Sequence, residues 1–483
     1  MINFRDNFIR RQTNLEHAEA SLTSHSYLLR KPRTHEPTDD SLNPQTSGEN
    51  EVEGVNPIRE RRRFELFIDL IWVGIVANLA DHFSEQAFSP ETTYTLGRAI
   101  LEFLILFLMA WRMWKFLQEF MGKYRTNDIV ERLFVVWALI LALGWGNNAP
   151  WVLDPDEPSS LAISLYLVFK ASVLLVESYY AMHLPHLRRR IILQTALSIP
   201  ILGLWLPAFW YEYPKRAGLL LAAIILEYWS SSFIDTPWAA RFIKDDRKEL
   251  LHTGHWVERV QDFYIIILGE GIMNLIRGSP LGKGITPTAG AGVSVLWVFY
   301  VLSCLFFNGD LSRRYIHAMR RTWWRRVIWL SIHVTMFGCT LIMGVCLTHL
   351  IQNIDVSAKI PERMEGESEK EFEEARKLAL SVSSSRWCAS STLGIILINL
   401  TKVALLNRSL DGPNTLKINN RYVRVFPRII AAIVIICLPI DTDMTCITYL
   451  GILTAILIPL MTWEWVASLE AGGGLIEPEF LKK

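Results

Sequence analysis

The sequence predicts an all-α fold, a polytopic transmembrane helix bundle of about twelve spans. The chain has 483 residues, of which 51% are hydrophobic and only 20% charged, whereas soluble proteins carry about 25% charged residues. Apolar stretches of roughly twenty residues lie between short charged loops, and a helix of that length crosses about 30 Å of hydrocarbon. Many of the 18 Trp residues stand near the ends of these stretches, as expected at a membrane interface.

The first 60 residues are predicted to form a disordered cytoplasmic arm. They are rich in Ser, Thr, Asn, Glu and Arg, with proline at positions 32, 37 and 44, and such a composition cannot bury a core. The polar N-terminus has no apolar h-region and is therefore not a secretory signal peptide. We expect the first span itself to direct the chain to the membrane.

The transmembrane domain is predicted over residues 61–470, before a short cytoplasmic tail over 471–483. The eleventh span is short, and a tilted or re-entrant segment is the alternative there. The twelve spans are expected near residues 64–84, 96–117, 129–149, 160–182, 191–210, 217–236, 256–276, 288–308, 326–351, 386–406, 426–440 and 445–467.

Basic residues gather in alternate loops, which predicts the orientation of the chain. Arginine clusters lie at 59–63, 188–190 and 313–326, whereas the acidic stretches at 154–158 and 441–443 fall in the other set of loops. Cytoplasmic loops are the ones enriched in Lys and Arg. We therefore expect both termini in the cytoplasm, and the plasma membrane rather than an internal membrane.

The ninth loop, residues 353–384, is long and acidic and is predicted to be extracytoplasmic. Its stretch PERMEGESEKEFEEARKLAL has the pattern of an amphipathic helix outside the membrane. A lid or docking element is one interpretation, and a solvated surface helix is the other.

A pair of carboxylates recurs at the start of spans one and seven. Glu65 and Asp69 are four residues apart, as are Glu258 and Asp262, so each pair shares one helix face. Spans one and seven would begin two halves, 61–240 and 250–470, with the same orientation. This arrangement predicts a 6+6 parallel internal repeat, of the kind found in some transporters.

Span seven carries several ionisable residues, in the stretch HWVERVQDFYIIILGEGIMNLI. His255 and Arg259 lie near its cytoplasmic end, and Arg259 is expected to pair with Glu65 or Asp69. Glu270 follows Glu258 by twelve residues, about 18 Å along a helix. A carboxylate that far into the membrane, between Gly269 and Gly271, suits a proton or cation site, although a buried glutamate satisfied by a neighbouring Arg, Trp or Ser is the alternative.

Other ionisable residues inside spans indicate a polar cavity or pathway, since such residues face the bundle interior or water. Asp128 and Arg132 share a face near the third span, where a simple charge pair at the helix start is the alternative interpretation. The candidate ion pathway or structural polar network comprises Glu65, Asp69, His82, Asp128, Arg132, Glu227, Asp235, His255, Glu258, Arg259, Asp262, Glu270 and His333.

Three segments carry a resemblance to a known family. RFELFIDLIWVGIVANLADH (63–82) resembles the ELFFDLVFV segment of bacterial low temperature requirement A proteins, and HWVERVQDFYIIILGE (255–270) resembles their HFAERFGLFVIIVLGE segment. YRTNDIVERL (124–133) is similar to their RFDTDDLVERL, with Asn127 in place of an aspartate. The positions that match family motifs are Glu65, Asp69, Arg125, Asp128, Arg132, His255, Glu258, Arg259 and Glu270.

The resemblance implies a multi-pass membrane protein whose biochemical role is poorly defined and whose name records a growth requirement in the cold. We expect a eukaryotic, fungal-type member. Compared with the family, the N-terminal arm and the acidic loop look like additions. The resemblance supports the fold and says little about the mechanism.

Three functions remain open from the sequence. A secondary transporter or ion permease with proton- or cation-coupled carboxylates explains the spans and the buried charges. A membrane sensor or scaffold for cold adaptation would use the arm and the acidic loop. An intramembrane lipid-modifying enzyme would need a metal at His82, His255 or His333, but no HExxH spacing is present. We therefore expect no enzyme activity.

The predicted partners are the lipid bilayer and a small solute or ion. We expect no cofactor and no metal, since the sequence has no P-loop, no CxxC pair and no paired histidines. Nucleic-acid binding is not expected, because the basic residues stand where membrane topology needs them.

Overall fold

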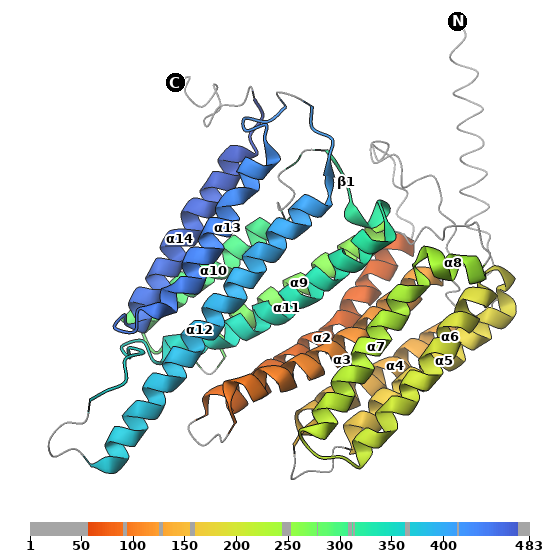
Figure 1. The fold of residues 1–483 in the computed structure, drawn as a ribbon, viewed down its shortest axis with the longest axis horizontal. Coiled ribbons are helices and arrows are strands. Elements are labelled where there is room, and N and C mark those ends of the chain that lie inside the picture. Colours follow the sequence, from red (N-terminus) through yellow and green to blue (C-terminus); the bar gives the residue numbers. More distant parts are fainter. Residues whose placement is uncertain are drawn as a thin grey trace, which may run out of the picture.

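The computed structural model describes residues 57–89, 94–124, 129–154, 160–243, 253–277, 279–307, 312, 314–362, 368–412 and 415–471. Most of the predicted arm and tail therefore lie outside the described residues, as do the motif positions Arg125 and Asp128. Within the described part, the chain is almost entirely helical (Figure 1). The all-α prediction is confirmed.

The first half of the chain forms six long helices and one short one. These are α2 (Pro57–Phe88), α3 (Leu96–Lys123), α4 (Ile129–Asn148), α5 (Ser160–His183), α6 (Pro185–Trp205), α7 (Lys215–Ile234) and the short α8 (Pro237–Ile243). Single turns of 3₁₀ helix, η2 (Ala149–Val152) and η3 (Leu206–Phe209), extend α4 and α6.

The second half forms six further long helices. These are α9 (Thr253–Met273), α10 (Pro287–Phe307), α11 (Trp323–Gln352), α12 (Glu369–Leu406), α13 (Arg421–Cys437) and α14 (Cys446–Ala467). Two 3₁₀ turns, η4 (Ala318–Arg320) and η5 (Leu438–Ile440), accompany them. A two-stranded antiparallel ribbon of β1 (Tyr315–Ile316) and β2 (Arg408–Ser409) ties two of the loops together.

Twelve long helices in the described residues thus coincide with the twelve predicted spans. Ten of them are long and apolar enough to cross a membrane by themselves. The other two, α3 and α9, carry too many charges to qualify alone, and both pack inside the bundle, against α2 and α11. The protein is therefore a multi-pass membrane protein, while the count of twelve crossings stays a prediction.

The acidic helix predicted in the ninth loop is continuous with the span that follows it. α12 begins at Glu369, far ahead of the span expected near 386–406. Ser368 starts the helix with a capping box, since its hydroxyl accepts from the Glu371 amide and the Glu371 carboxylate accepts from the Ser368 amide. The helix is one rigid element because neither Gly nor Pro interrupts the join between 369 and 386.

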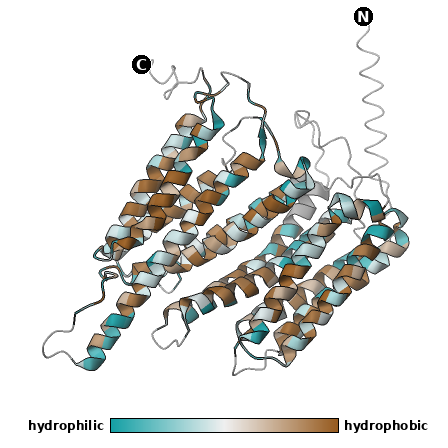
Figure 2. Ribbon diagram, in the orientation of Figure 1, coloured by the Kyte–Doolittle hydropathy of each residue, from teal (hydrophilic) through white to brown (hydrophobic). Residues whose placement is uncertain are grey.

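The described chain begins and ends on the same side of the bundle (Figure 1). We call this side, where α2 begins and α14 ends, the N-terminal face, and the other side the opposite face. Figure 2 shows hydrophobic residues along much of the long helices and hydrophilic residues at the first turns of α12. Exposed Leu70, Leu175 and Ile225 illustrate side chains suited to contact with lipid.

The six long helices of each half pack in the same order. In the first half α2 contacts α3 and α4, α3 contacts α4 and α7, and α4, α5, α6 and α7 pack in succession. In the second half α9 contacts α10 and α11, α10 contacts α11 and α14, and α11, α12, α13 and α14 pack in succession. Each of these seven pairs of neighbouring helices in one half therefore has its counterpart in the other half.

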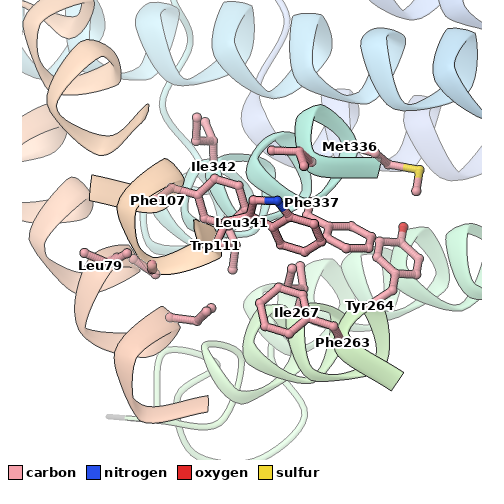
Figure 3. Packing of buried hydrophobic residues seen from close by; sticks show 14 of the residues in the cluster. Leu79, Phe107, Trp111, Phe263, Tyr264, Ile267, Met336, Phe337, Leu341 and Ile342 are labelled. Carbon is pink, nitrogen blue, oxygen red and sulfur yellow. The ribbon is translucent and has the colours of Figure 1, made fainter. Parts of the chain in front are cut away.

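The two halves meet along α2, α3, α9 and α11, where aromatic side chains form the core (Figure 3). The Trp111 ring lies 5.5 Å from the Phe263 ring and 5.7 Å from the Phe337 ring, measured between centroids. Such edge-to-face pairs pack densely without polar groups. This apolar centre separates the polar groups near the N-terminal face from those near the opposite face.

Candidate functional site

A buried ion network joins α2, α3 and α9 near the N-terminal face. Arg259 is 1% exposed, and its guanidinium forms a salt bridge with Asp69 on α2. It also donates to Asp262 Oδ2 at 3.0 Å and to Gln118 Oε1 at 3.0 Å. The pairing of Arg259 with a carboxylate of the first span, expected from the sequence, is present.

The other partners of Asp69 complete this network. Trp114 Nε1 and Gln118 Nε2 on α3 donate to Asp69 Oδ1 at 3.1 and 3.3 Å. His255 Nε2 lies 3.1 Å from Glu65 Oε2, which joins the first turn of α9 to the third turn of α2. We call Glu65, Asp69, Gln118, Arg259 and Asp262 the Arg259 network. Because Glu65, Asp69, Gln118 and Arg259 each have a partner on another helix, the network fixes α9 against α2 and α3.

Glu270 belongs to a separate chain of charges near the opposite face. Its side chain is 2% exposed, but it lies in the last turn of α9 rather than in the middle of the helix. Arg277 Nη2 donates to Glu270 Oε1 at 3.3 Å, and Arg277 Nη1 donates to Asp81 Oδ2 at 2.6 Å. These contacts match the alternative interpretation, a buried glutamate satisfied by a neighbouring arginine. A role of Glu270 in proton or cation coupling stays a prediction.

The glycine after Glu270 permits close packing of α9 against α10 and α11. A Cβ atom at Gly271 would lie 2.3 Å from the Phe299 ring on α10, and one at Gly344 on α11 would lie 3.3 Å from the Gly271 Cα. At Gly269 nothing lies within 4 Å of such an atom. Close approach of the helix thus depends on Gly271 and not on Gly269.

A second buried ion cluster surrounds Glu227 on α7. Lys170 Nζ on α5 lies 2.8 Å from Glu227 Oε2, and Arg112 Nε on α3 lies 3.4 Å from the same oxygen. Tyr166 OH donates to Glu227 Oε2 at 3.0 Å, and Trp205 Nε1 donates to Oε1 at 3.1 Å. We call these five residues the Glu227 cluster.

The Glu227 cluster lies far from the ends of its helices. Lys170 follows the start of α5 by ten residues and precedes its end by thirteen, and Glu227 precedes the end of α7 by seven. Glu227 is 4% exposed. A carboxylate so placed must be compensated inside the bundle, because hydrocarbon offers no solvation.

Two adjoining cavities connect this cluster with the N-terminal face. The first, of about 50 Å³, is lined by Arg112, Lys170 and Glu227 among others. The second, of about 100 Å³, extends to Arg190 and Asp235 near the N-terminal face. The residues that line both are Lys115, Phe116, Glu119, Gln194 and Ser231. We refer to the two together as the α3–α7 cavity.

A family model described as bacterial low temperature requirement A protein matches residues 62–462. This match spans most of the chain. The chain belongs to the low temperature requirement A family. No match was found among the curated proteins or among the solved structures.

Several low temperature requirement A motif positions come together in the structure. Four of them belong to the Arg259 network or contact it, namely Glu65, Asp69, His255 and Arg259. Glu270 is more than two turns away along α9 and has other partners. The motif residues of spans one and seven therefore hold two helices together at one point.

The remaining predicted site residues are scattered. Asp235 ends α7 and accepts from Arg190 at 3.0 Å, whereas His333 Nδ1 lies 2.7 Å from the Trp329 carbonyl oxygen. His82 is partly buried on α2, Glu258 is partly buried on α9, and Arg132 is exposed on α4. Within the described ranges, no group of three or more His, Cys, Asp or Glu is arranged to hold a metal ion.

Sequence reasoning missed the partners of the buried carboxylates. No charge pattern within one span identifies these partners, which are Arg277, Tyr166, Trp205 and Gln118. Arg277 follows Glu270 by seven residues, two helical turns, and this spacing was the available signal. A further buried pair, Arg428 Nη2 with Glu464 Oε2 at 2.8 Å, joins α13 to α14 and was also missed.

Proposed function

We propose that this low temperature requirement A protein is a secondary transporter or ion permease. A small solute or ion crosses beside the Glu227 cluster, without chemical change, and coupling to protons or cations uses the buried carboxylates. The supporting observation is the Glu227 cluster itself, which lies far from the helix ends and lines the α3–α7 cavity. Transporter sites commonly lie near the bilayer midplane.

Glu227 is suited to exchange partners during transport. One carboxylate oxygen contacts both Lys170 and Arg112, so loss of its negative charge on protonation leaves two cations without a counter-charge. Buried charges are held only while they are paired. Protonation of Glu227 and binding of a solute would therefore be coupled through Lys170 and Arg112.

The matching helix order of the two halves supports a parallel 6+6 repeat. The fifth helix of each half, α6 and α13, contains an internal proline, Pro200 or Pro427. Each then ends in a 3₁₀ turn with a Leu-Pro pair, at Leu206–Phe209 and Leu438–Ile440. Movement of one half against the other gives alternating access in transporters built from repeats, and the Arg259 network would hold the junction.

The test is solute and proton flux into liposomes that contain the purified full-length protein. Wild type is compared with Glu227→Gln, and Glu464→Gln is the matched control, because Glu464 is equally buried and paired but does not line the cavity. We expect gradient-driven flux in wild type, loss of more than about tenfold in Glu227→Gln, and near wild-type flux in Glu464→Gln.

Glu270→Gln is measured beside them. Loss of flux in a folded Glu270→Gln protein would place a second coupling carboxylate near the opposite face. Absence of flux in folded wild type, over a range of ions and organic solutes, would contradict the proposal and favour a sensor or scaffold.

A further inference from the structure

We infer that the α3–α7 cavity binds a small oxyanion, a phosphate or carboxylate group. This inference rests on the proposed transport function, because it names the class of solute that the cavity would carry. It follows from the charges of the cavity, their pairing, the unused donors and the available space.

Cations outnumber carboxylates among the described residues that line the cavity. The six cations are Arg112, Lys115, Lys123, Lys170, Arg190 and Arg326, and the four carboxylates are Glu119, Glu177, Glu227 and Asp235. The formal surplus is two positive charges, from six minus four. An anion would remove this surplus, and a cation would increase it.

Two carboxylates of the cavity are each shared by two cations. Glu227 is shared by Lys170 and Arg112, and Asp235 is shared by Arg190 at 3.0 Å and Arg326 at 3.5 Å. The buried Lys170 and Arg112 therefore share one carboxylate, Glu227. Charge without a full counter-charge inside a protein is costly, and a bound anion would relieve that cost for these two cations.

Two donors at the wider part of the cavity have capacity to spare. Among the described residues, Lys123 has no carboxylate within 4.0 Å, and the buried Nε of Arg326 has no hydrogen-bond partner. Arg and Lys are the side chains that bind phosphate and carboxylate groups by charge-assisted hydrogen bonds. Oxygen acceptors of a bound anion would satisfy both donors.

The cavity has room for a small polyatomic anion. Its two parts measure about 50 and 100 Å³, whereas one water molecule needs about 10–15 Å³ by the same measure. The oxyanion would be either a free solute or the headgroup of an anionic lipid. Both carry the same kind of oxygen acceptor, and both could reach the cavity from the N-terminal face.

The test measures thermal unfolding of the full-length protein against anion concentration at constant ionic strength. In detergent without anionic lipid, the probes are inorganic phosphate and succinate, with chloride as reference. We expect a saturable rise in Tm with phosphate or succinate. In Lys123→Gln the half-saturating concentration should rise about tenfold, as for loss of one charge-assisted hydrogen bond.

Lys402→Gln is the matched control, because Lys402 is exposed on α12 and lines neither part of the cavity. It should bind like wild type. A rise in Tm only in nanodiscs that contain phosphatidic acid, and not in phosphatidylcholine alone, would identify the oxyanion as a lipid headgroup. No saturable rise in either setting, or an equal rise in Lys123→Gln, would overturn the inference.

The outcomes separate this inference from the transport proposal. Anion binding without any flux in liposomes would retain the binding site and remove the transport function. Flux of a cation by a protein that binds no oxyanion would retain transport and remove the inference.

Discussion

At the scale of single residues, buried charges in this protein are held by partners on other helices. Arg259 contacts Asp69, Asp262 and Gln118 at once, and Glu227 contacts four side chains. A buried ion pair adds little net stability compared with apolar packing. Removal of one partner, however, leaves the other charge buried without a counter-charge. These residues therefore specify how the helices pair more than they stabilise the fold.

Arg259→Met should lower the free energy of unfolding by about 3–5 kcal/mol, because Asp69 would stay buried without its cation. Thermal unfolding in detergent measures the loss as a lower Tm. The double variant Arg259→Met/Asp69→Asn should recover part of the loss, since the remaining group is then neutral. An unchanged Tm in the single variant would show that the Arg259 charge does not stabilise the buried Asp69 carboxylate.

At the scale of elements, α9 is the helix that combines charge with close packing. It carries the Arg259 network at one end and Glu270 at the other, and it crosses α11 at Gly271 and Gly344. Small residues permit such approach between membrane helices, where packing and hydrogen bonds replace the hydrophobic driving force. The flanking glycine Gly269 has open space instead.

Gly271→Ala should destabilise the protein by about 1–3 kcal/mol, because the added methyl group overlaps the Phe299 ring. Gly269→Ala is the matched control on the same helix. It should be neutral or stabilising by up to about 1 kcal/mol, since alanine favours helix and meets no neighbour there. Thermal unfolding of the two variants side by side measures the difference, and equal Tm values would argue against close packing of Gly271 on Phe299 of α10.

At the scale of the whole molecule, the two faces of the bundle differ in charge. The basic loops named from the sequence lie at the N-terminal face, and the acidic helix of α12 projects from the opposite face. Lys and Arg mark cytoplasmic loops. The N-terminal face is therefore predicted to be cytoplasmic.

Labelling of single cysteines in intact cells tests this orientation. In a variant without the six native cysteines, Lys370→Cys on α12 should react with a membrane-impermeant maleimide, because Lys370 is exposed at the opposite face. Arg241→Cys on α8 should react only after permeabilisation, since α8 lies at the N-terminal face. The reverse pattern would invert the predicted topology.

The positions of the helices could be read from the sequence with little error. Each predicted span overlaps one long helix, because in lipid a segment of about twenty apolar residues satisfies its backbone hydrogen bonds only as a helix. The acidic stretch before 386 was assigned to a separate helix, and its join to α12 was not foreseen. Helical pattern alone does not show whether two adjacent helices are continuous.

The candidate site was only partly accessible to sequence reasoning. The pairing of Arg259 with Glu65 or Asp69 was predicted from charges near the cytoplasmic ends of spans one and seven, and the structure shows the salt bridge with Asp69. Glu270 was preferred as the functional residue because of its distance from Glu258 along the helix. Its partner Arg277 lies beyond the end of α9. The Glu227 cluster needed Tyr166 and Trp205, whose side chains carry no charge to signal them.

The sequence by itself determined that this is a helical membrane protein, where its helices lie and which of them carry charge, because these properties depend on the length and composition of single segments. Only the tertiary structure decided that Glu227 contacts Lys170 and Arg112 beside a cavity. It also decided that Gly271, rather than Gly269, meets a neighbouring helix. Contacts between helices depend on how each helix is rotated and packed against the others, and no single segment contains that information.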